Sequence, residues 1–260
     1  MRTEKLGVIL IAVAFMLVVI FSSVGLFSLK KIDVDFSVSK NMNSEQIQKT
    51  LDGYLGENLL FFNAGKIYDS LKDNPYVEVV SVKKDYPNVL RVEINERREV
   101  FLIHSGEKYF ATTDEGFVLR ELQKSEFELS RDKILLDFDG VTLTNIVVGQ
   151  TLSCDNVDVL STVIEMAKSV NLTDCIKKIT VKALAGIREY NAEFKTHSGV
   201  KMIIEDLMDL GVDKTLNAFN AYDNILTDYQ KADGEIQSYV MYDERFRVTY
   251  NQQEVWTSGN

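Results

Sequence analysis

Cysteine, proline, tryptophan and histidine are scarce in this chain of 260 residues, which has two Cys, two Pro, one Trp and two His. Two prolines cannot form a proline-rich stalk or linker. His104 and His197 stand 93 positions apart without ligand-type neighbours, so neither is predicted to bind a metal or to act in catalysis. Metal-ligand spacings, glycine-rich phosphate loops and nucleophile elbows are also missing. The sequence therefore predicts no catalytic residue, no cofactor, no metal and no small-molecule substrate.

The two cysteines, Cys154 and Cys175, would suggest a disulfide if the body lies outside the cytoplasm. Residues 155–170 between them have a helical pattern, however. A helix of that length holds its ends about 24 Å apart, whereas bridged Cα atoms lie within about 7 Å. We therefore expect two free thiols.

Basic charge is also in short supply, because 29 Lys and Arg face 39 Asp and Glu, for a net charge of −10. Residues 1–31 carry four basic residues and one acid, so the remainder carries −13. An acidic body excludes nucleic acid as an expected partner and argues against a body lying on anionic lipid.

Charge is absent altogether from Leu6–Leu29, a run of 24 residues. As a helix this run is about 36 Å long, enough to cross a ~30 Å hydrocarbon core with some tilt. The run predicts a single transmembrane helix. A cleaved signal peptide is one alternative, although its apolar core has only about 7–15 residues; a buried soluble helix is another.

The flanking charges do not decide the topology. Arg2 and Lys5 precede the run, and Lys30 and Lys31 follow it, so the positive-inside rule gives a tie. A five-residue tail most simply stays in the cytoplasm, which puts the body outside.

Residues 30–98 predict a β-α-α-β-β order. The first strand alternates polar and apolar residues over 31–38, and Asn43 is a cap candidate for the first helix. A second helix begins at Asn63 and ends before Pro75, and strands follow at 76–84 and 89–95.

Residues 99–250 predict a mostly antiparallel β domain with two helices, so that the whole chain is α+β. The helices are expected at 155–170 and from Asp213 onward. The predicted divisions are a tail at 1–5, the transmembrane helix at 6–29, a first domain at 30–98, the β domain at 99–250 and a polar C-terminal tail at 251–260.

The first domain resembles the POTRA domain of the FtsQ/DivIB family, the single-pass bacterial cell-division proteins. The likeness rests on an ordered set of motifs directly after the apolar run: Gly56-x-Asn58-Leu59-Leu60, Asn74-Pro75-Tyr76-Val77, Val80-x-Val82-x-Lys84-x-Tyr86-Pro87-x-x-Leu90-x-Val92 and Glu96-Arg97. Glu99 departs from the pattern, since a proline usually stands there. Thr113-Asp114-Glu115-Gly116 resembles the opening of the family's second domain.

The resemblance implies a non-enzymatic scaffold of the divisome, anchored in the cell membrane and found at the division septum. Its implied partners are small bitopic coiled-coil division proteins of the FtsL and FtsB/DivIC types, through which it would help to control septal peptidoglycan synthesis. The family is thought to hold its partners along the last strand of its second domain.

An aromatic and apolar face on the last expected strands is the candidate partner interface. Its residues are Tyr239, Tyr242, Phe246, Val248 and Tyr250. Such a face either packs in the core of a sheet or lies beside an exposed edge to which a partner strand adds.

Two alternatives remain open. Asp137 and Asp139 follow an apolar strand and precede a glycine, which resembles the first motif of haloacid-dehalogenase-type phosphatases. The chain would then be a membrane-anchored, Mg²⁺-dependent phosphatase, although that fold needs a helix soon after the motif. The other alternative is a POTRA adaptor in a different process of envelope or spore assembly.

Overall fold

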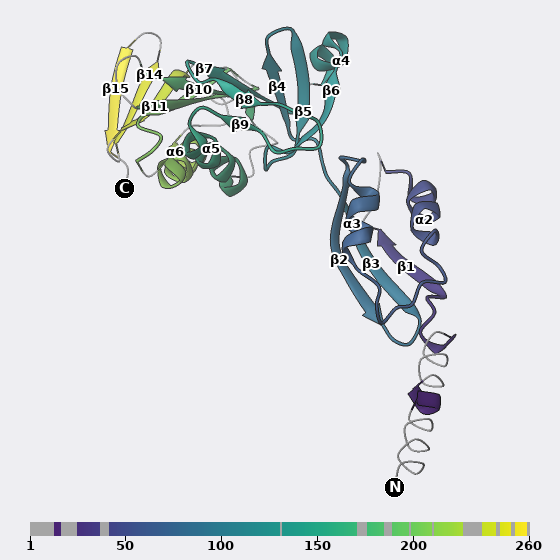
Figure 1. The fold of residues 1–260 in the computed structure, drawn as a ribbon. Coiled ribbons are helices and arrows are strands. Elements are labelled where there is room, and N and C mark those ends of the chain that lie inside the picture. The colour runs from purple at the N-terminus through teal and green to yellow at the C-terminus, as the bar shows by residue number, and fades with distance from the viewer. Residues whose placement is uncertain are drawn as a thin grey trace. The chain divides into compact units, whose positions relative to one another are not determined.

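The computed structural model describes residues 13–16, 25–36, 42–130, 132–170, 176–184, 189–197, 199–209, 211–225, 236–242, 245–250 and 253–258, the last three ranges as backbone. The chain forms two compact units, Met1–Arg97 and Arg98–Asn260, so the division falls one residue before the expected one (Figure 1).

Most of the predicted transmembrane run, together with the tail at 1–5, lies outside the described residues, which include only 13–16 and 25–29 of it. In the described part of the chain, no helix combines the length and the hydropathy needed to cross a bilayer. The transmembrane helix therefore stays a prediction.

The first unit has the predicted β-α-α-β-β order. Its elements are β1 (Lys31–Phe36), α2 (Ser44–Asp52), α3 (Gly65–Leu71), β2 (Val77–Asp85) and β3 (Val89–Glu96). β3 lies in the middle of the sheet, parallel to β1 and antiparallel to β2.

Local sequence explains these elements. Asn43 caps α2 by accepting a hydrogen bond from the Gln46 amide at 3.1 Å. Ile47 and Leu51 face the core from α2, and alternation along β3 buries Leu90 and Ile94. The helices thus cover one face of a sheet whose other face is polar.

The second unit is built on one ten-stranded sheet with the order β15-β14-β13-β12-β11-β10-β7-β4-β5-β6. Its strands are β4 (Phe101–Ser105), β5 (Lys108–Thr112), β6 (Val118–Leu122), β7 (Ile134–Asp139), β10 (Ile176–Ala183), β11 (Tyr190–Thr196), β12 (Lys201–Ile204), β13 (Ile236–Tyr242), β14 (Arg245–Tyr250) and β15 (Gln253–Ser258). A small second sheet pairs β8 (Leu143–Asn145) with β9 (Ser153–Cys154).

The large sheet is mixed. β7 runs parallel to both β4 and β10, and β12 runs parallel to β13, while the other neighbouring pairs are antiparallel. The parallel step from β7 to β10 needs a long crossover connection. That connection contains β8, β9 and the helix α5 (Val157–Val170).

Helices cover the two faces of this sheet unequally. α5 and α6 (Gly211–Ile225) pack together over the main core (Figure 1). There Phe194 of β11 meets Phe219 of α6 edge-on, with ring centroids 5.7 Å apart. The opposite face has a small cluster under α4 (Lys124–Leu129), in which Leu102 and Leu122 are buried. The predicted helix pair is confirmed, whereas α4 was not expected.

Cys154 is a buried free thiol, as predicted, and its Sγ lies 2.7 Å from the Asn156 carbonyl oxygen. Burial raises the pKa of this thiol above its usual value. Cys175 lies outside the described residues.

Replacing Phe194 with Ala should destabilise the second unit by about 3–5 kcal/mol, because it empties a buried ring site between β11 and α6. Urea unfolding of the detergent-solubilised chain can be followed by the fluorescence of Trp256, the chain's single tryptophan, which belongs to this unit. As a control, Leu129→Ala alters a side chain that is 81% exposed, and should change stability by less than about 0.5 kcal/mol. Equal unfolding midpoints for the two variants would contradict this assignment of the core.

Candidate partner-binding surfaces

The five residues of the predicted interface lie on inner strands of the large sheet. Tyr239 and Tyr242 belong to β13, whereas Phe246, Val248 and Tyr250 belong to β14. Tyr239 pairs with Val248, and Tyr242 pairs with Arg245, so the two strands form one antiparallel ladder. The backbone places all five residues in adjacent strands.

The edge of the sheet is one strand farther along than the sequence suggested. β13 is paired on both sides, with β12 and β14, and β14 is also paired on both sides, with β13 and β15. The expected polar tail at 251–260 contains β15, which pairs with β14 over its full length. The correction is therefore that β15 is the edge strand. Val255-Trp256-Thr257, three residues that favour strands, was the signal for it.

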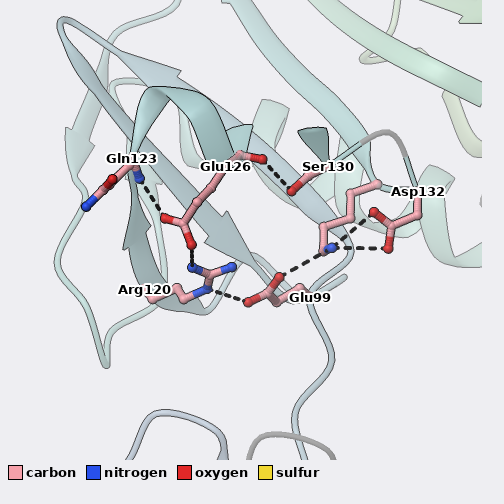
Figure 2. A network of polar contacts seen from close by, with 7 residues as sticks. Glu99, Arg120, Gln123, Glu126, Ser130 and Asp132 are labelled. Carbon is pink, nitrogen blue, oxygen red and sulfur yellow. Dashed lines mark hydrogen bonds and ion pairs between the residues drawn. The ribbon is translucent and has the colours of Figure 1, made fainter. Parts of the chain in front are cut away.

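A network of charged side chains joins the first residues of the second unit to the other edge strand, β6 (Figure 2). The Glu99 carboxylate accepts a hydrogen bond from Arg120 Nε at 2.7 Å and lies 3.5 Å from Lys133 Nζ. Arg120 also donates to Glu126 on α4 at 3.0 Å. Lys133 reaches Asp132 at 3.1 Å.

This network surrounds Glu99, the residue that departs from the motif in the sequence analysis. Glu99 is 11% exposed at its side chain, and its two oxygens meet two different cations, which link the segment before β4 to β6 and to the start of β7. Charge-assisted contacts of Glu99 therefore hold this corner in place.

The same network caps α4. The Gln123 amide donates to the Glu126 carboxylate at 2.9 Å, and this hydrogen bond, reinforced by Arg120, lowers the pKa of Glu126. A carboxyl group with a lowered pKa stabilises the fold when ionised. Its contribution is present above the ordinary glutamate pKa and is lost as the pH falls through the lowered value.

The sheet face opposite α5 and α6 carries a ladder of ion pairs. Lys178 of β10 meets Asp137 of β7 at 2.7 Å, while Glu193 of β11 accepts a hydrogen bond from Lys182 at 2.9 Å and lies 3.5 Å from Lys201. Burial opposes the ionisation of Glu193, but the two lysines outweigh it and lower its pKa.

A hollow of about 560 Å³ lies on this face beside α4. The side chains around it are apolar or basic apart from Glu128 and Ser130, and they comprise Leu102, Phe127, Glu128, Ser130, Lys133, Leu135, Lys177 and His197. Phe127 continues into a stack with Tyr109 and His104, whose ring centroids are 4.4 and 4.7 Å apart in succession. Both histidines thus lie at the surface of this face.

Asp137 and Asp139, the acidic pair of the phosphatase-like motif, lie at the end of β7. Asp137 is occupied by the ion pair with Lys178 and accepts a hydrogen bond from the Phe138 amide. After the turn at Gly140, where φ is +75°, the chain enters β8 instead of the helix that a phosphatase of this type needs. Among the described residues, no group of three or more His, Cys, Asp or Glu side chains is arranged to hold a metal ion.

The comparisons with known proteins agree with the resemblance found in the sequence. The family model described as "POTRA domain, FtsQ-type" matches residues 27–97. A protein named cell division protein DivIB from Clostridium acetobutylicum is 31% identical over 169 residues, which cover 65% of this chain and 64% of that protein. Another of the same name, from Clostridium botulinum strain Loch Maree, is 23% identical over 81% of each chain.

The matched region thus spans less than two thirds of the Clostridium acetobutylicum protein. Among solved structures, the major extracytoplasmic domain of DivIB from Geobacillus stearothermophilus matches with a TM-score of 0.26 and 10% identity. That match covers 47% of this chain and 95% of the other.

A double-mutant cycle on Glu99 and Arg120 should give a coupling energy of about 2 kcal/mol, because the pair is short and partly buried. The matched control is Lys108 and Glu121, an exposed pair at 3.0 Å between β5 and β6, for which about 0.5 kcal/mol is expected. Each residue is replaced by Ala singly and together, and stability is read from urea unfolding. If the two cycles give the same coupling, the network does not fix the corner.

Proposed function

The chain belongs to the FtsQ/DivIB family of cell-division proteins, and from this premise we propose that it is a non-enzymatic scaffold of the divisome. The helix at 6–29 anchors it in the cell membrane by a single pass, and the body stands outside the cytoplasm at the division septum. There it binds small bitopic coiled-coil proteins of the FtsL and FtsB/DivIC types. Through them it helps to control septal peptidoglycan synthesis.

The observation that carries the binding role is the open edge of the ten-stranded sheet at β15. In the described part of the chain, β15 pairs with β14 on one side only. An edge strand presents alternate N–H and C=O groups outward, and a partner segment in extended form satisfies them by adding as a further strand. The backbone then supplies affinity, and side chains on the added strand supply specificity.

The five residues predicted at the interface fit this role as the layer behind the edge. β14 holds β15 in register, with Trp256 opposite Arg247 and Val255 opposite Val248, and β13 pairs with the other side of β14. Under this proposal Tyr239, Tyr242, Phe246, Val248 and Tyr250 belong to the two strands behind the docking strand.

The phosphatase alternative has no observation in its favour. Its would-be nucleophile, Asp137, is held by Lys178, and a β-strand follows where the motif requires a helix. An adaptor in another process of envelope or spore assembly would keep the same fold, so only the site of action separates it from a division protein.

A fluorescent protein fused before Met1, on the cytoplasmic tail, should accumulate at mid-cell in dividing cells and not along the side walls. The control is the same fluorescent protein joined to residues 1–31 alone, which should spread evenly because it has the anchor without the body. An even distribution of the full-length fusion around dividing cells would overturn the division role.

Two proline substitutions test the edge itself. Successive N–H groups of a strand point to opposite sides, so of Val255→Pro and Trp256→Pro one removes a bond to β14 and the other removes an outward donor. The variant that removes the outward donor should stay folded. It should bind soluble segments of FtsL-type and DivIC-type proteins about tenfold more weakly, a loss of about 1.4 kcal/mol in binding free energy. Circular dichroism identifies the variant that stays folded, and titration calorimetry measures binding. Unchanged affinity in the folded variant would remove β15 from the interface.

A further inference from the structure

Three segments meet at one end of the first unit, where the predicted transmembrane run ends. The Leu29 amide donates to the Glu57 carbonyl oxygen at 2.8 Å, and the Leu59 amide donates to the Phe27 carbonyl oxygen at 2.7 Å. The Lys30 amide donates to the Asn88 carbonyl oxygen at 2.9 Å, which adds the turn between β2 and β3. In Figure 1 this turn and the start of β1 lie at the same end of the unit. We call residues 26–31, 55–61 and 84–88 together the tip.

The tip exposes large apolar side chains next to a hydrogen-bonded loop. Phe61 is 83% exposed, Tyr86 is 53% exposed and Leu60 is 38% exposed, although their neighbours Leu59 and Phe62 are buried in the core. Asn58 fixes the loop, because its side-chain oxygen accepts from the Leu60 amide at 3.0 Å and its carbonyl oxygen accepts from the Phe61 amide at 3.2 Å. A loop built to hold apolar groups in water is typical of an interaction surface.

The charge of the tip differs from that of the body. Three carboxylates at this end of the unit are each paired with a base: Asp33 with Lys31 at 3.1 Å, Glu57 with Lys66 at 2.7 Å, and Asp85 with Arg91 at 2.7 Å. Lys84 reaches the Leu60 carbonyl oxygen at 3.1 Å, and Lys30 is exposed at the exit of the apolar run. The body as a whole has a net charge of −13, which lipid phosphates would repel. At the tip, the paired carboxylates and the lysines offset this repulsion.

We propose that the tip is a membrane-interface surface, in which Leu60, Phe61 and Tyr86 enter the boundary between lipid headgroups and acyl chains. Lys30 and Lys84 then meet the headgroup phosphates. Aromatic rings and lysines favour that boundary because each joins an apolar body to a polar end. The inference rests on the proposed membrane anchoring.

The bilayer is the occupant that the chain itself points to. The apolar run Leu6–Leu29 ends at a residue that is hydrogen-bonded to the exposed loop, through the Leu29 amide to Glu57 and through the Gly56 amide to the Leu29 carbonyl oxygen at 2.8 Å. Any surface that receives the run therefore comes close to Leu60 and Phe61. The first unit is held on the lipid by this contact as well as by its tether.

The test uses the single tryptophan of the chain. In a Trp256→Phe background, Phe61→Trp places the only tryptophan at the tip. The full chain is reconstituted into vesicles of phosphatidylcholine with a minor share of phosphatidylglycerol, with and without lipids brominated near the headgroup end of the acyl chains. The matched control is Val80→Trp in the same background, since Val80 is also exposed on β2 but lies about 17 Å along the strand from Asp85.

The expected result is a quench by brominated lipid that is several-fold larger for Phe61→Trp than for Val80→Trp, together with blue-shifted emission. Flotation of the vesicles tests the anchoring separately. Chain that does not float with the vesicles overturns the anchoring on which the inference rests. Chain that floats while both tryptophans are quenched equally little overturns the tip inference alone, and blue-shifted Phe61→Trp emission without quenching would assign the tip to a protein contact instead.

Discussion

The backbone hydrogen bonds that join Phe27, Leu29 and Lys30 to the first unit are the constraint on which the rest of the structure depends. Each contributes about 1 kcal/mol net, and they act together with the burial of Leu29, which is 1% exposed. The end of the apolar run is thus part of the folded unit, and β1 begins two residues after it. In the described residues 25–36, the end of the apolar run therefore leads directly into the folded unit.

The two units differ in how the rest of the chain is connected to them. The first unit is hydrogen-bonded to the segment that enters it, next to the loop that exposes Leu60 and Phe61. The second unit has its own core and its own edges, of which β6 is tied to Glu99 through Arg120 and β15 is open. The proposed scaffold role would use both properties, a fixed position and an edge at which a partner can add.

The sequence predicted the first unit well because its signals are local. The alternation along β3, the cap at Asn43 and the proline after Asn74 each act within a few residues. The ordered motifs lie in the region that the FtsQ-type POTRA model matches. α4 was missed because it has only six residues and is held by the contact of Glu126 with Gln123 and Arg120, which a periodicity search cannot find. The role of Glu99 was equally hidden, since its partners lie 21 and 34 positions away.

The edge of the large sheet was misplaced for a different physical reason. Strand order depends on long-range pairing, and β12 pairs in parallel with β13 across the whole of α6. β15 is rich in polar residues, as edge strands often are. For that reason the sequence predicted a polar tail there. The acidic pair at Asp137 and Asp139 is the opposite case. Its local sequence resembles a phosphatase motif, but Asp137 forms an ion pair with Lys178 on the neighbouring strand.

Hydrogen exchange on the full chain in lipid nanodiscs tests the central constraint most directly. If the apolar run and the first unit form one body, the amides of Leu29, Gly56 and Leu59 exchange as slowly as those of the β2–β3 ladder. Exchange of these three amides at the rate of an unstructured linker, while the ladder stays protected, would show that the anchor is only a flexible tether.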